Sequence, residues 1–185
     1  LYTLRASMQG SDEVIPVNVG FRKIELKGGQ ILVNGKAVLF KGADRHELDP
    51  DGGYVVSPER MLQDIQIMKQ YNLNAVRTCH YPDNNLWYDL CDKYGILVWQ
   101  DFMFACSTYP MTAERLENIR QEAIDNIVRL RNHPCIAIWC GNNENHTAWF
   151  NWGWMQKYEK LGVLEEMRKD DKELFHKLLP EVVKE

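Results

Sequence analysis

The residues best suited to chemistry lie at the end of an apolar run, in "IAIWCGNNEN" at residues 136–145. A carboxyl group beside apolar surface such as Trp139 can have its pKa raised, and it can then act as a general acid. The adjacent amide of Asn143 can hydrogen-bond a substrate hydroxyl. A loop glutamate is often only solvated, but we take Glu144 as a candidate acid/base. We count Asn143 and Trp139 as candidate substrate-binding residues.

Polar residues also follow three other apolar runs. These are "DRHE" at 44–47, "TCHY" at 78–81 and "QD" at 100–101. Two histidines in such positions, His46 and His80, are typical of a polar surface that contacts a sugar. A metal site would need a third ligand with suitable spacing, which we do not find in the sequence, so we expect no metal and no cofactor.

Asp101 has two interpretations that the sequence leaves equally open. It either contacts the ligand, in which case it belongs to the substrate-binding set, or it forms an ion pair with Arg45 or Arg77. Both interpretations place it near the other polar residues.

The segments that must position these residues alternate between strand and helix. Strands are predicted at 38–42, 75–81, 96–102 and 135–139, and helices from Ser57 to about 70, at 84–95, from Thr112 to before Pro134, and over 154–184. Apolar strands between amphipathic helices are typical of a parallel sheet with both faces covered. Because the carboxyl ends of parallel strands share one edge, the four polar segments are expected to converge there.

The first part of the chain has a different pattern. Residues 1–26 predict β-strands, 27–30 a turn, and 30–40 a hairpin around Asn34-Gly35. An eight-unit α/β barrel needs about 250 residues, so only four βα units fit here. The predicted fold is therefore α/β: the first four units of a TIM (β/α)8 barrel, preceded by a short β segment.

Composition excludes several classes of partner. The 185-residue chain is 45% hydrophobic and 26% charged, with a formal net charge of -4. We expect neither nucleic acid nor a membrane as a partner, because there is no basic patch and no apolar run of about 18 residues. Five cysteines without a CxxC pair are typical of small buried residues in a reducing compartment, which slightly favours the cytoplasm over the periplasm or secretion.

The sequence resembles glycoside hydrolase family 2 over nearly its whole length. The resemblance is carried by "GFRKIEL", "ILVNGKAVLFKGADRHE", "MLQDIQIMKQYNLNAVRTCHYP", "LWYDLCDKYGILVWQD" and the Asn143-Glu144 pair. It implies that residues 1–26 are the last strands of an immunoglobulin-like β-sandwich domain. Residues 27–185 would then be the N-terminal half of a catalytic TIM barrel.

Different motifs of the sequence resemble different branches of the family. "RHE" and "CHYP" resemble the β-galactosidase and β-glucuronidase branch, whereas "WQDFMFACSTYP" and "WCGNNEN" resemble the β-mannosidase branch. The magnesium-binding Glu and His of many β-galactosidases have no match after the third strand. We therefore expect β-mannosides as the first substrate class and β-galactosides or β-glucuronides as the alternative.

The resemblance implies a role for each candidate residue. Glu144 would be the acid/base of a retaining exo-β-glycosidase, Asn143 would hold the sugar 2-hydroxyl, and His46 and His80 would line the sugar pocket. A retaining enzyme also needs a nucleophilic carboxylate about 5 to 5.5 Å from the first. In the family it comes from a later strand, so we expect it beyond residue 185 and expect the chain alone to be inactive.

Two other interpretations remain open. The chain could be a non-catalytic half barrel that binds a sugar or a partner, or a structural unit that pairs with a complementary half. In each case the open sheet edges lead us to expect self-association or packing against the rest of a barrel.

Overall fold

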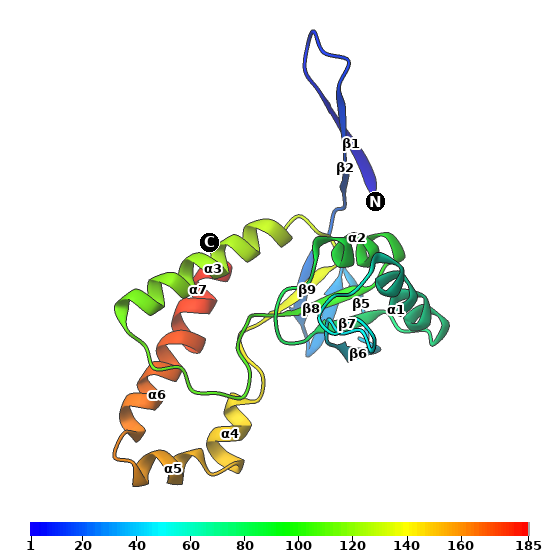
Figure 1. Ribbon diagram of the computed structural model, residues 1–185. Helices are drawn as coiled ribbons and strands as arrows, with labels where there is room; N and C mark the ends of the chain where they lie inside the picture. The colour runs from blue at the N-terminus through cyan, green and yellow to red at the C-terminus, as the bar shows by residue number, and fades with distance from the viewer. Residues whose placement is uncertain (185) are drawn as a thin grey trace. The chain divides into compact units, whose positions relative to one another are not determined.

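The computed structural model describes residues 1–184 (Figure 1). The chain divides into two compact units. The first unit comprises residues 1–77, 83–99 and 130–137. The second comprises residues 78–82, 100–129 and 138–184. Most of the candidate residues, including Glu144, belong to the second unit, and His46 belongs to the first.

The N-terminal residues form strands, as predicted, and these strands pair in an antiparallel arrangement. Strand β1 (Tyr2–Ser7) pairs with β2 (Val14–Val19), and β3 (Ile24–Lys27), β4 (Gln30–Val33) and β5 (Lys36–Ala37) form a second sheet. Asn34 and Gly35 join β4 to β5, both at positive φ, which a tight hairpin turn requires. The predicted boundary after Leu26 falls inside β3, and the immunoglobulin-like assignment of residues 1–26 stays a prediction.

A four-stranded sheet follows in the order β6-β7-β8-β9. Its strands are β6 (Gly42–Arg45), β7 (Ala75–Thr78), β8 (Leu97–Asp101) and β9 (Ile136–Cys140). Helices α1 (Pro58–Gln70), α2 (Asn85–Tyr94) and α3 (Ala113–Leu130) connect successive strands. Each strand lies beside its neighbour in sequence, which confirms the predicted βα order and the parallel α/β sheet.

The first strand of this sheet lies later than predicted. We expected residues 38–42, followed by a polar loop, but β6 covers Gly42–Arg45. The hydropathy pattern placed the strand too early in the sequence because it treats Arg45 as a surface residue. Its guanidinium is instead buried between the carboxylates of Asp64 and Asp83, which neutralise its charge.

The helical C-terminal region also begins earlier than predicted. Helix α4 (Asn145–Asn151) starts directly after Glu144, ahead of the predicted start at 154. Helix α5 (Trp154–Lys160) follows after Gly153, which has positive φ and separates the two helices. The remaining elements are α6 (Leu164–Lys172), the π-helical turn η1 (Glu173–Leu178) and α7 (Leu179–Lys184).

Each unit has its own apolar core. In the first unit, buried residues of α1 and α2 include Ile65, Trp87 and Tyr88. In the second, Phe102 and Phe104 pack with residues of α3, η1 and α7, and Trp149 packs with Tyr158 and Met167. None of the helices over residues 1–184 is both long and apolar enough to span a bilayer.

Candidate functional site

The segment after β9 is held against the segment after β8. Asn143 forms a parallel bridge with Ala105, in which the Asn143 N–H donates to the Phe104 carbonyl at 3.0 Å. The Cys106 N–H donates to the Asn143 carbonyl, also at 3.0 Å. These bonds extend the pairing of β8 with β9 beyond the strands themselves. They fix the backbone that carries both Asn143 and Glu144.

Glu144 stands at the turn between β9 and α4. Its backbone is left-handed, with φ of 60° and ψ of 11°, and its side chain is exposed. The Cys106 thiol donates to Glu144 Oε2 at 3.4 Å, and Asn143 Nδ2 donates to the Cys106 sulfur at 3.3 Å. The structure therefore brings Asn143 and Glu144 into one polar group with Cys106, a residue that the sequence pattern led us to expect among the buried cysteines.

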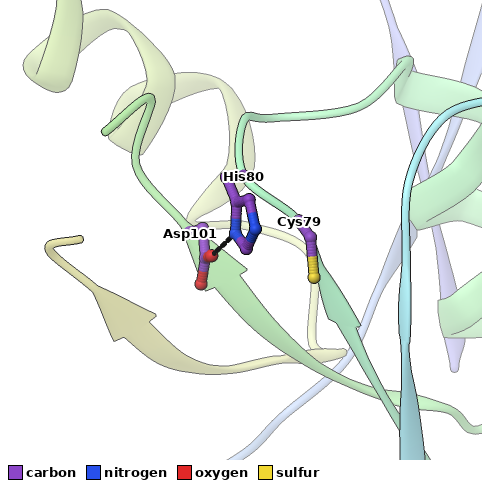
Figure 2. A group of neighbouring side chains, drawn as sticks. All are labelled: Cys79, His80 and Asp101. Carbon is purple, nitrogen blue, oxygen red and sulfur yellow. Dashed lines mark hydrogen bonds and ion pairs between the residues drawn. The ribbon is translucent and has the colours of Figure 1, made fainter. Parts of the chain in front are cut away.

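His80 and Asp101 form a second polar pair, shown in Figure 2. His80 Nδ1 lies 2.8 Å from Asp101 Oδ2, and the Asp101 carboxylate is fully buried. A carboxylate on one imidazole nitrogen fixes the orientation of the ring. The structure thus gives Asp101 a histidine partner that the sequence did not suggest, while its contact with a ligand stays a prediction.

A buried hydrogen-bond chain supports this pair. Thr78 Oγ1 donates to Gln100 Oε1 at 2.7 Å, and Gln100 Nε2 donates to the Asp101 carbonyl at 2.8 Å. Both side chains are fully buried. Gln100 is absent from the predicted site residues, although a glutamine inside an apolar strand is a signal that could have identified it.

The remaining candidate residues are Trp139 and His46. Trp139 is half-buried and stacks on Phe102, with ring centroids 5.3 Å apart, as part of the apolar core of the second unit. His46 is exposed and follows β6 in the first unit. Their roles in substrate binding stay predictions.

The tryptophans after Glu144 are divided between core and surface. Trp149 is buried and packs edge-on against Trp154, with Tyr158 beside both. Trp152 is 48% exposed. Trp149 and Trp154 therefore belong to an apolar cluster, and Trp152 is the most exposed of the three.

Two groups among residues 1–184 have donor atoms close enough to hold a metal ion. One is Cys79, His80 and Asp101, and the other is Asp89, Asp92 and His133. A thiolate, an imidazole and a carboxylate together suit zinc. In the first group, His80 Nδ1 and Asp101 Oδ2 already form a direct bond of 2.8 Å, which orients the ring without an ion. We therefore assign that pair to orienting the imidazole.

The cysteines differ in accessibility, which corrects the expectation that they are buried. Cys79, Cys91 and Cys135 are buried, Cys140 is partly buried and Cys106 is exposed. Loss of hydration raises the pKa of the Cys91 and Cys135 thiols, so their reactive thiolates are scarce even in mild alkali.

Iodoacetamide should therefore label the native chain first at Cys106. Cys91 and Cys135 should stay unmodified until the chain is unfolded, because their thiols are buried and their pKa values are raised. Peptide mass mapping over time measures the order of labelling. A Cys106→Ala variant, which should lose the fast site, is the control, and early modification of Cys91 would contradict the prediction.

Comparison with known protein sequences identifies glycosyl hydrolases as relatives of this chain. A family model described as "Glycosyl hydrolases family 2, TIM barrel domain" matches residues 24–169. A β-galactosidase from Lactococcus lactis is 44% identical over 147 residues, or 72% of this chain, and one from Oenococcus oeni is 42% identical over 76% of it. The chain spans 14% and 15% of the lengths of these two relatives.

Solved structures show the same likeness. A β-D-mannosidase from Dictyoglomus thermophilum aligns with 92% of this chain and 21% of its own, at a TM-score of 0.75 and 32% identity. A β-glucuronidase from Parabacteroides merdae aligns with 78% of this chain and 18% of its own, at a TM-score of 0.69 and 28% identity.

Proposed function

The chain belongs to glycosyl hydrolase family 2, and from this membership we propose that it is part of a retaining exo-β-glycosidase with Glu144 as its acid/base. The observation that carries the proposal is the position of Glu144. Its exposed carboxyl follows the fourth strand of a parallel sheet, where α/β barrels place their catalytic groups. Asn143, whose backbone forms the bridge with Ala105, directly precedes Glu144.

The two polar groups suit the two tasks of the reaction. Glu144 would protonate the leaving oxygen and later activate water, as the acid/base of a retaining enzyme does. The Asn143 amide would bind a sugar hydroxyl. His80, whose ring is oriented by Asp101, would contact the sugar as well. The nucleophilic carboxylate would come from a later strand of the barrel.

We propose β-mannosides as the first substrate class. Support comes from the residues after β8 and β9, which resemble β-mannosidases, and from the mannosidase structure that aligns with 92% of the chain. β-Galactosides are the second candidate, because two β-galactosidases are 44% and 42% identical to the chain over the aligned residues. Kinetics of the enzyme that carries this chain on p-nitrophenyl β-mannoside, β-galactoside and β-glucuronide decide the order, and equal rates would remove the preference.

The 185-residue chain by itself is expected to be inactive on all three aryl glycosides. One carboxylate cannot both attack the sugar and protonate the leaving group in a retaining reaction. Turnover is measured by nitrophenolate release, with Glu144→Gln as the control for contaminating activity. Turnover by the chain that disappears in Glu144→Gln would contradict the expectation. Inactivity of the enzyme that carries the chain would favour the non-catalytic half barrel.

Self-association of the 185-residue chain is expected as well. In the described sheet β6 and β9 each have one strand neighbour, and open strand edges recruit further chains. Sedimentation velocity at tens of micromolar should show dimers or larger species that dissociate on dilution. A single monomeric boundary over the whole concentration range would argue against it.

A further inference from the structure

The position of Cys106 is set by the backbone and not by core packing. Its N–H donates to the Asn143 carbonyl, its φ is 48°, and its side chain is exposed. An exposed cysteine contributes little to apolar burial. The structure therefore holds this thiol at a defined place where packing gives no reason for it.

The thiol lies between the two residues of the proposed acid/base motif. It accepts from Asn143 Nδ2 at 3.3 Å and donates to Glu144 Oε2 at 3.4 Å. Glu144 precedes α4 but makes no capping bond with its side chain. Among residues 1–184, the Cys106 thiol is the one side-chain donor that reaches the Glu144 carboxylate.

We propose that Cys106 is a positioning residue for Glu144. Its S–H bond to Oε2 holds the carboxyl beside Asn143 and leaves Oε1 to exchange a proton with the substrate. This inference rests on the proposed function, because it gives Cys106 a role only if Glu144 is the acid/base.

The chemistry of a thiol suits this role. As Glu144 gives up its proton to the leaving oxygen, negative charge develops on the carboxylate, and a donor to Oε2 stabilises that charge. A thiol is a weak hydrogen-bond donor, so its contribution is smaller than that of a charged donor. The effect should be modest in size and should appear in kcat more than in KM.

The test uses Cys106→Ala and Cys106→Ser in the enzyme that carries this chain. Loss of one hydrogen bond to a charged group should lower kcat by about 10-fold on a glycoside with a poor leaving group, with KM little changed. The pH profile of kcat/KM should also differ from that of the wild type in Cys106→Ala, because the thiol donates to the proposed acid/base. Cys106→Ser, which keeps an O–H donor, should restore most of both.

A double-mutant cycle shows whether Cys106 acts through Glu144. In a Glu144→Ala background, Cys106→Ala should have no further effect, because the group it positions is gone. Ser107→Ala, a neighbouring exposed position, is the matched control and should leave the pH profile unchanged.

The possible failures are distinguishable. A wild-type rate and pH profile in Cys106→Ala, or additive losses in the double variant, would overturn the positioning role and leave the proposed function intact. A Glu144→Ala enzyme with no dependence on the leaving group would overturn the proposed function, and the positioning role with it.

Discussion

Glu144→Ala, in the enzyme that carries this chain, is expected to slow the hydrolysis of glycosides with poor leaving groups by roughly 10² to 10⁴-fold. These substrates need a proton on the departing oxygen, and Glu144 is the group proposed to supply it. The aryl group of an activated aryl glycoside departs without that proton. The first step for such glycosides should be spared, and hydrolysis of the glycosyl-enzyme should become rate-limiting.

Azide gives an independent readout of the same role. As an anion it attacks the glycosyl-enzyme without help from a general base, so it should restore turnover of activated substrates by Glu144→Ala. The product should be the β-glycosyl azide, which nuclear magnetic resonance identifies. Glu122→Ala, on the exposed surface of α3, is the matched control and should behave as wild type. An equal loss on all substrates without azide rescue would show that Glu144 is not the acid/base.

The largest expected effect on stability comes from Asp83→Ala. Arg45 is 7% exposed, donates from Nη1 to Asp83 and from Nε to Asp64 at 2.9 Å, and lies 3.9 Å from the centre of the Trp87 ring. The Asp83 side chain is fully buried. Removing the Asp83 carboxylate leaves the buried Arg45 guanidinium with one of its two negative partners missing. This should lower the unfolding free energy by about 3 to 5 kcal/mol. Urea unfolding of the 185-residue chain measures the loss.

Two further variants separate the charge from the packing. Arg45→Met together with Asp83→Ala removes both charges, so it should destabilise the chain less than Asp83→Ala alone. Glu173→Ala breaks the exposed pair with Lys177 and should leave the unfolding free energy almost unchanged, because solvent screens that pair. If Asp83→Ala cost no more than Glu173→Ala, the buried network around Arg45 would not stabilise the fold.

Local sequence patterns determined the elements of this chain well. Side-chain periodicity, together with a helix start at Ser57, predicted α1, α2 and the alternation of strand and helix, because these signals lie within a few residues of one another. Polar residues at strand ends also pointed to Asn143 and Glu144. The errors at β6 and α4 arose where tertiary burial, of Arg45 in one case and Trp149 in the other, overrode the local pattern.

Only the tertiary structure decided which of the polar residues meet. His80 and Asp101 are far apart in sequence, and their contact depends on the pairing of β7 with β8. Cys106 reaches Glu144 because a backbone bridge joins the segments after β8 and β9. A sequence pattern carries the period of a single element, whereas these contacts follow from strand order and from the hydrogen bonds between strands. The physical reason is the distance along the chain over which the interactions act. Short-range interactions determine each helix or strand, and long-range interactions between strands determine which side chains meet.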